Sequence, residues 1–394
     1  MTNFRITSKL LFLTMLAFPG LVAAENVEQH GQWAESTPSA ESIEESALMA
    51  LDAEITAGAH GDIHSLLLIR NGKIVFERRY SRDYSTINRP HDAASHQHNK
   101  LNEIRHPWYQ VDSGLHTMQS VSKTVLAALY GIALKQGVLR SVDVPALALL
   151  ERRDFPDPDG RKATITVSDL LTMRSGFAWD EDSCEDLTDP RNICAQLMAS
   201  EDWVQFVLEQ PMADDPGSTF VYNGGNAMLL AEILENAVGQ SVADYAEAEL
   251  FAPLGIREYY WKRSPTGLVD AQGGLYLRPR DIARIMQLWL NEGRWGIQQI
   301  VSADWVRDSV SPATSQTYPE WPPWDKVGYG FLWWDFTTFV GTQMQSYGGV
   351  GLGGQWPVAI PDLNLVIVIT GWTIDRDTIS HLEIVRERIL PAVH

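Results

Sequence analysis

The chain has 394 residues, of which 45% are hydrophobic, and it carries a formal net charge of −19. This length suits one large domain or two closely packed ones. So acidic a surface repels phosphate groups, which argues against a nucleic-acid partner, although it says little about a small substrate.

The first 24 residues have the pattern of a secretory signal peptide. Arg5 and Lys9 form a basic start, residues 10–22 form an apolar run, and Val22-Ala23-Ala24 resembles a cleavage site. A membrane-spanning helix is the alternative, but the run is short and contains Pro19-Gly20. We expect an exported, periplasmic or secreted protein with no stable membrane anchor after cleavage. Its mature net charge would be −21, because residues 1–24 hold two basic residues and no acidic one.

The next segments predict an arm, a helix and a hairpin. Residues 25–42 are polar and lack periodicity, which predicts a flexible N-terminal arm. Residues 42–58 have apolar positions at helical spacing after Ser42, a residue type that often precedes a helix. Two β-rich runs in residues 64–80 meet at Asn71-Gly72, the strongest short signal for a β-hairpin.

Residues 81–115 form a long polar connection. A metal site is one interpretation of its four histidines, but no fixed ligand spacing is present, so we expect a solvated loop and no metal. These histidines are His91, His96, His98 and His106.

Helical patterns dominate from Val125 to about Gly255, and strand-like runs follow one more helix after Gly273. A hairpin near the start, strands near the end and helices between them predict an α+β fold. Its antiparallel sheet is built from both termini and flanked by helices, with an all-α insertion. We expect one catalytic domain over 43–394, with its α/β part at 43–115 and 270–394 and its helical part at 116–269.

The two cysteines, Cys184 and Cys194, lie in one short segment. Export permits a disulfide bond between them. Two free thiols are an equally good interpretation, because the sequence does not give their geometry.

Ser120 and Lys123 lie at the start of an apolar helical pattern, in the stretch "HTMQSVSKTV". Residues i and i+3 share a helix face, so the two side chains are expected to touch. A serine hydroxyl becomes a good nucleophile when a base takes its proton, and a desolvated lysine can be that base. Ser122 is a competing hydroxyl, but it is adjacent to Lys123, and adjacent residues on a helix point away from each other. This S-x-x-K pattern alone is weak evidence, since it also occurs by chance.

Several blocks in a fixed order strengthen the interpretation. The chain resembles the serine β-lactamase and penicillin-binding-protein superfamily, and within it the class C-like esterases and 6-aminohexanoate-dimer hydrolases. The resemblance runs from about residue 40 to the C-terminus. Its blocks include "HSLLLIRNGKIVFE", "HTMQSVSKTVLAALYGIAL", "PGSTFVYNGGNAMLLAEILENAVGQS" and "GGQWPVAIPDLNLVIVITGW".

The resemblance implies roles for the residues that match the family's first two motifs. Ser120 would be the acylated nucleophile, Lys123 its base and Tyr222 the group that relays a proton to the leaving group. The strict β-lactamase form of the second motif is Tyr-x-Asn. Here it reads Tyr222-Asn223-Gly224, so the amide at the third position is missing. Asn223 and Trp179 are expected to contact substrate, although Trp179 fits a capped loop with a buried aromatic equally well.

The family's third motif, Lys-Thr-Gly or a variant, falls on Ser346-Tyr347-Gly348. Its lysine is absent, which argues against β-lactam hydrolysis. Tyr347 and Gly348 are expected near the substrate, and the N–H groups of Ser120 and Gly349 are expected to form the oxyanion hole. Alternatively, these glycines only let strands pack closely.

Other motifs give no support to different chemistry. The glycines from Gly349 to Gly354 match G-x-G-x-x-G, but the run precedes a predicted strand rather than a helix, so we expect no nucleotide cofactor. G-x-S-x-G and H-E-x-x-H do not occur. We therefore expect a serine hydrolase that needs no cofactor and acts on a small ester or amide. A β-lactamase or D-amino-acid peptidase is the alternative enzyme, and a non-catalytic penicillin-binding sensor is the alternative outside the enzymes.

Overall fold

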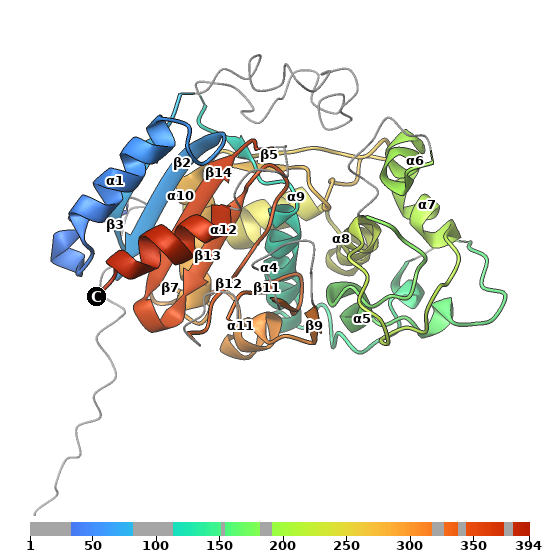
Figure 1. Ribbon diagram of the computed structural model, residues 1–394. Coiled ribbons are helices and arrows are strands. Elements are labelled where there is room, and N and C mark those ends of the chain that lie inside the picture. The colour runs from blue at the N-terminus through green and yellow to red at the C-terminus, as the bar shows by residue number, and fades with distance from the viewer. Residues whose placement is uncertain are drawn as a thin grey trace, which may run out of the picture.

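A computed structural model of the protein describes residues 33–394 apart from 82–112, 151–153, 182–190, 317–326, 338–343 and 374–380. Its main sheet has nine described strands in the order β1-β3-β2-β14-β13-β12-β11-β10-β9 (Figure 1). All neighbours are antiparallel except β1 and β3. The strands are β1 (Ala34–Glu35), β2 (Ile63–Arg70), β3 (Lys73–Arg79), β9 (Thr314–Gln316), β10 (Val327–Tyr329), β11 (Trp334–Asp335), β12 (Tyr347–Gly348), β13 (Trp356–Ile360) and β14 (Leu365–Gly371).

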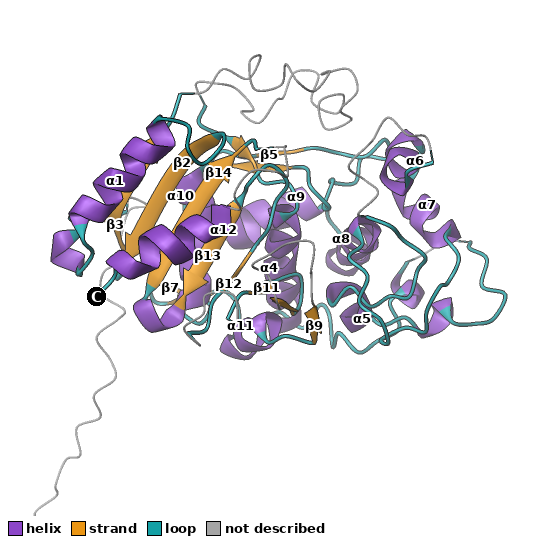
Figure 2. Cartoon of the chain, viewed as in Figure 1, coloured by secondary structure: helices purple, strands orange, loops and turns teal. Residues whose placement is uncertain are grey.

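The centre of the sheet is covered on both faces. Strands β2 and β14 are buried at every position, as expected for strands between two layers of helices. Helices α1 (Glu45–Thr56) and α12 (His381–Ile384) lie on one face, and α10 (Pro279–Leu290) lies on the other (Figures 1 and 2). The predicted α+β class, with a sheet built from both ends of the chain, is confirmed.

The predicted hairpin is also confirmed. Asn71 and Gly72 both have positive φ angles, 51° and 72°, as a two-residue turn between β2 and β3 requires.

The helical part lies beside the sheet, on the right in Figure 1. Helix α4 (Val121–Lys135) separates it from the sheet and is buried from Val121 to Ala133, because it is apolar on all sides. The other helices of the helical part are α5 (Val167–Leu171), α6 (Ile193–Ala199), α7 (Trp203–Glu209), α8 (Gly224–Val238) and α9 (Val242–Ala246). Helix α11 (Ala303–Val310) also packs on α4, where Trp305 Nε1 donates to Ala127 O at 3.0 Å.

Two small sheets complete the fold. Strand β4 (His116–Thr117) pairs with β6 (Leu275–Leu277), which also pairs with β5 (Tyr260–Trp261). This three-stranded sheet fixes the start of α4 against the turn that precedes β6. Strands β7 (Arg294–Trp295) and β8 (Gln298–Gln299) form a separate hairpin.

The predicted flexible arm is wrong for its described part, residues 33–42. Trp33 is buried and meets Trp295 edge to face, and Glu35 pairs with Ile74 in the sheet. Glu41 is buried and accepts hydrogen bonds from the Asn71 and Lys73 side chains. These contacts hold the segment although its own sequence has no periodic pattern. Residues 25–32 lie outside the described part of the chain, as do the four histidines between 91 and 106.

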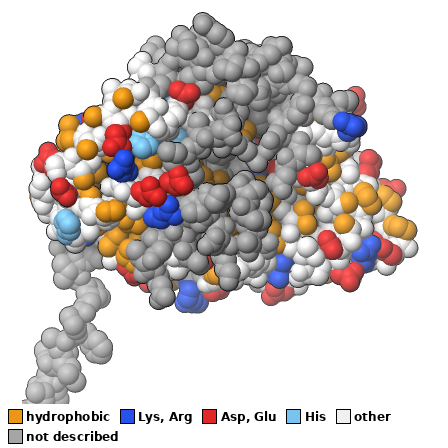
Figure 3. Space-filling view, viewed as in Figure 1, with side chains coloured by type: hydrophobic (Ala, Val, Ile, Leu, Met, Phe, Trp, Pro, Cys, Tyr) orange, Lys and Arg blue, Asp and Glu red, His pale blue; other side chains and the backbone are white. Residues whose placement is uncertain are grey.

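On the face drawn in Figure 3, the coloured acidic and basic side chains are interspersed rather than gathered by sign. Among the described residues, no helix has both the length and the apolar content needed to cross a membrane.

Candidate active site

Ser120 forms the N-cap of α4 and follows a residue with an unusual backbone. Gln119 has a φ of 48°, in the left-handed region that non-glycine residues rarely adopt. Its carbonyl oxygen accepts hydrogen bonds from Ser122 N at 2.9 Å and Ser122 Oγ at 2.7 Å, and Leu275 N donates to Ser122 Oγ at 3.1 Å. Ser122 is therefore a fully buried support for the turn, which leaves Ser120 as the half-buried hydroxyl at the helix start.

Lys123 lies one turn further along α4, with a side chain that is only 1% exposed. Its Nζ is 2.9 Å from Ser120 Oγ and 2.8 Å from the carbonyl oxygen of Gln272. The predicted contact between Ser120 and Lys123 is thus present. A neutral amine held at this distance can take the hydroxyl proton, and the positive end of the α4 dipole lies close by.

The carbonyl that binds Lys123 belongs to a tight turn over residues 270–274. Asp270 Oδ1 accepts from Gly273 N at 3.2 Å, and Asp270 O accepts from Gly274 N at 2.9 Å. Burial raises the pKa of the Asp270 carboxyl, while the positive charges of Lys262 and Lys123 act in the opposite direction. The turn therefore places a carboxyl group and two lysines in one buried region behind Ser120.

Tyr222 lies on the other side of the lysine. Its ring centroid is 4.9 Å from Lys123 Nζ, and the half-buried ring stacks on Trp334 at a centroid distance of 5.7 Å. Trp333, its neighbour in sequence, is instead fully buried against Trp289. Ser120, Lys123 and Tyr222 are therefore brought together as the sequence predicts, although the contact of Lys123 is with the ring of Tyr222.

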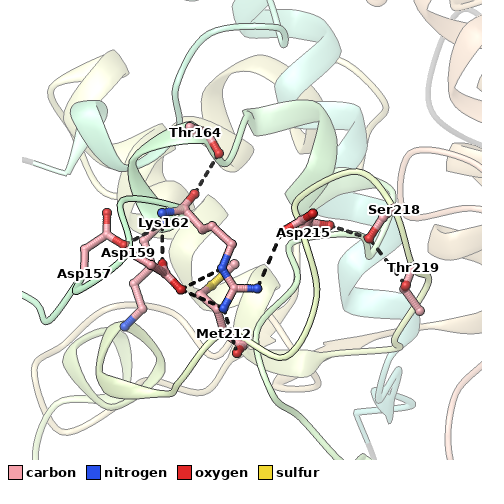
Figure 4. Close-up of polar contacts among 9 residues, drawn as sticks. Asp157, Asp159, Lys162, Thr164, Met212, Asp215, Ser218 and Thr219 are labelled. Atoms are coloured by element: carbon pink, nitrogen blue, oxygen red, sulfur yellow. Dashed lines mark hydrogen bonds and ion pairs between the residues drawn. The ribbon is translucent and has the colours of Figure 1, made fainter.

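Polar contacts hold the segment that leads to Tyr222. Val221 N donates to Met173 O at 2.9 Å. Further back, Arg161 donates to Asp159 Oδ2 at 2.9 Å and to Met212 O at 3.2 Å, and it lies 3.6 Å from Asp215 (Figure 4). The loops before α5 and before α8 are thereby joined, which fixes the approach of Tyr222 to the site.

The predicted role of the Gly349 N–H does not fit the structure. This N–H donates to Pro357 O at 3.1 Å, because residue 349 continues the pairing of β12 with β13. Gly351 N donates in the same direction, to Gln355 O at 2.9 Å. N–H groups alternate along an extended strand, so the N–H of Val350 points to the opposite edge.

Val350 lies beside the start of α4. A Cβ atom on Gly349 would lie 3.1 Å from the Val121 side chain, and one on Gly351 would lie 2.5 Å from Met118 O. These contacts place the intervening Val350 next to Ser120. Neither the Ser120 N–H nor the Val350 N–H has a hydrogen-bond partner within the described residues. The third motif is therefore displaced by one residue from the predicted register.

Three predicted substrate contacts are instead structural. Tyr347 is buried with its ring edge to face with Trp333, and a Cβ on Gly348 would lie 2.0 Å from Pro357 O. Gly348 thus permits close strand packing, the alternative that the sequence left open. Asn223 is 1% exposed and caps α8 by accepting from Asn226 N at 3.3 Å.

Trp179 acts through a neighbouring carboxylate. It is buried, and its Nε1 donates to Glu181 Oε2 at 2.6 Å. The same oxygen accepts from Gly224 N at 2.8 Å, at the start of α8. Trp179 therefore orients Glu181 at a helix N-terminus, which favours a negative charge.

The remaining sequence predictions have separate outcomes. Cys194 is disulfide-bonded, and Cys184 lies outside the described residues, so the pairing of these two cysteines stays a prediction. The run from Gly349 to Gly354 precedes strand β13, as predicted, and not a helix.

Comparisons with known proteins agree with this geometry. A family model described as Beta-lactamase matches residues 64–371, which is most of the chain. The 6-aminohexanoate-dimer hydrolase of Paenarthrobacter ureafaciens is 23% identical over 278 residues, covering 67% of each protein. A relative in Escherichia coli O157:H7, whose given name proposes a D-alanyl-D-alanine carboxypeptidase, is 24% identical over 284 residues. That match covers 60% of this chain and only 63% of the relative.

The fold is shared with solved structures. A family VIII carboxylesterase superposes with a TM-score of 0.65 at 14% identity, covering 92% of this chain and 99% of the other. Identity this low supports a common fold and leaves the substrate to be decided by the site itself.

Proposed function

The chain belongs to the Beta-lactamase family, and we propose that it is a serine hydrolase that is exported, forms an acyl-enzyme on Ser120 and hydrolyses a small ester or amide. The hydrogen-bond distance of 2.9 Å between Ser120 Oγ and the buried Lys123 Nζ carries the proposal. A nucleophile and a base at this distance, at the start of a buried helix, have the arrangement that covalent catalysis requires.

The first half of the proposed reaction forms the acyl-enzyme. Ser120 Oγ attacks the substrate carbonyl carbon while its proton passes to Lys123 Nζ. The N–H groups of Ser120 and Val350 donate to the oxygen that gains negative charge. When the bond to the leaving group breaks, Tyr222 relays the proton from Lys123 to the departing alcohol or amine.

The second half uses water. A water molecule attacks the acyl carbon, loses a proton to the same relay and releases the carboxylic acid, and Ser120 Oγ regains a proton. Each turnover consumes one water and returns the protein to its starting state.

A β-lactamase or D-amino-acid peptidase is a second proposal, supported by the name of the Escherichia coli relative. The missing lysine argues against it, because the displaced register puts Tyr347, which is uncharged and buried, at the first position of the third motif. Side-by-side labelling with a fluorophosphonate and a fluorescent penicillin tests the two proposals. Strong fluorophosphonate labelling with weak penicillin labelling supports the esterase or amidase.

Export is supported by the sequence pattern of residues 1–24 and by the bonded state of Cys194, since disulfides persist in oxidising compartments. Expression of the full chain in a bacterial host tests it. The mass of the periplasmic protein should correspond to a chain that starts at Glu25. An uncleaved protein in the cytoplasm would contradict export.

A further inference from the structure

Gln272 lies between the catalytic lysine and the start of α8. Its backbone oxygen accepts from Lys123 Nζ at 2.8 Å, which places the residue directly beside the reacting groups. Gln272 is buried, with 7% of its surface exposed. No sequence pattern marks this position, because it lies in a turn outside the three motifs.

The side chain of Gln272 fills the space that a side chain at position 224 would need. A Cβ built on Gly224 would lie 2.7 Å from Gln272 Oε1 and 3.1 Å from Glu181 Oε1. Gly224 is the first residue of a regular helix and has no positive φ, so its backbone does not require glycine. Glycine is needed here because Gln272 and Glu181 occupy the adjacent space.

The amide nitrogen of Gln272 is buried and has no hydrogen-bond partner within the described residues. Buried side-chain donors are normally paired in folded proteins, so an unpaired one in a residue that contacts Lys123 indicates a group that a ligand completes. Amides and esters carry the carbonyl oxygens that such a donor binds.

We propose that Gln272 is a substrate-binding residue whose amide nitrogen donates to a carbonyl oxygen near the scissile bond, and that it takes the place left by the absence of a side chain at position 224. This inference rests on the proposed serine hydrolase function. It narrows the substrate class to small esters or amides that carry a second carbonyl group.

Matched substrates and a transposition of the side chain test the proposal. The substrates are p-nitrophenyl butyrate and the p-nitrophenyl ester of N-acetylglycine, which share a leaving group and differ in the second carbonyl. In a second pair of esters, one member carries an amide in the alcohol part and the other an alkyl group. A preference within this pair places the contact on the alcohol side. The variants are Gln272→Met, which keeps the length but removes the donor, Gln272→Ala, Gly224→Asn and the double variant Gly224→Asn/Gln272→Ala.

The wild type should prefer the amide-bearing ester of at least one pair. Gln272→Met and Gln272→Ala should lower the ratio of kcat/KM for that ester to kcat/KM for its alkyl counterpart about tenfold, equivalent to about 1.4 kcal/mol. Gly224→Asn alone should impair both esters, because the new side chain collides with Gln272. The double variant should regain most of the preference, since the carboxamide then comes from α8.

Two outcomes would overturn the proposal. One is a ratio of amide-bearing to alkyl ester that Gln272→Met leaves unchanged in both pairs, which would assign Gln272 a structural role. The other is a folded double variant that prefers the amide-bearing ester over the alkyl ester no more strongly than the poorer single variant does. Failure of the proposed function is distinguishable, because the wild type would then form no adduct on Ser120 and cleave neither ester.

Discussion

Lys123 Nζ lies 2.9 Å from Ser120 Oγ, and both residues lie at the start of α4. The lysine is fixed from the other side by Gln272 O, at 2.8 Å, and its Nζ lies 4.9 Å from the Tyr222 ring centroid.

Lys123 and Tyr222 should act as one proton-transfer unit with Ser120. Lys123→Ala and Tyr222→Phe should each lower kcat/KM on a p-nitrophenyl ester by about 10²- to 10⁴-fold, because each removes a group that moves the proton. The double variant should be little worse than the poorer single, since the two losses interrupt the same relay. Losses that multiply cleanly, or a silent Tyr222→Phe, would refute the shared relay.

Ser122 should matter for stability and not for the covalent step. Ser122→Ala leaves Leu275 N without its acceptor and removes a hydrogen bond to Gln119 O, which should lower the free energy of unfolding by about 1–3 kcal/mol. Urea unfolding measures the loss. Fluorophosphonate should still label this variant, and loss of labelling in a folded Ser122→Ala protein would question the choice between the two serines.

Short-chain p-nitrophenyl esters should be cleaved far better than cephalosporins. Tyr347, at the first position of the third motif in its observed register, offers no positive charge for the carboxylate of such an antibiotic, and loss of one charge-assisted hydrogen bond corresponds to about a 10- to 100-fold lower affinity. Nitrocefin and p-nitrophenyl butyrate assayed on one preparation, with Ser120→Ala as background, test this. Comparable values of kcat/KM would show that β-lactams are substrates.

Glu41 should stabilise the fold in a pH-dependent way. Hydrogen bonds from Asn71 and Lys73 lower the pKa of its carboxyl from 4.5 to about 2. Because the folded-state pKa is lowered, the stabilisation is complete above about pH 4.5 and is lost as the pH falls toward 2. Glu41→Gln should therefore cost about 1.5–3 kcal/mol at pH 7 and clearly less at pH 3.

Urea unfolding at the two pH values checks this prediction, with Glu201→Gln as a control at an exposed acidic residue. The control should change stability little at either pH. An equal cost of Glu41→Gln at pH 7 and pH 3 would contradict the ionised contact.

The sequence predicted the parts of the site that depend on local spacing. Ser120 and Lys123 are one helical turn apart, so their contact follows from helix geometry once the helix is recognised. The turn at Asn71-Gly72 is similarly local. Tyr222 needed the resemblance to a family, because nothing in its own segment shows that it approaches α4.

The errors arose where pairing between distant strands decides the outcome. The oxyanion donor depends on whether the N–H of residue 349 or that of residue 350 points toward β13. A shift of one residue reverses the direction of each N–H group. Residues 33–42 were predicted to be flexible because they lack a periodic pattern. Their contacts, such as that of Trp33 with Trp295, involve residues far along the chain and leave no local signal. Gln272 was missed for the same reason, since its meeting with Gly224 is visible only in three dimensions.

The covalent role of Ser120 is the central claim, and peptide mass spectrometry after fluorophosphonate treatment tests it most directly. We expect one adduct per chain, located on the peptide that contains Ser120 and absent from Ser120→Ala, while Ser122→Ala keeps it. An adduct that persists in folded Ser120→Ala, or one found only on another residue of the wild type, would contradict the account.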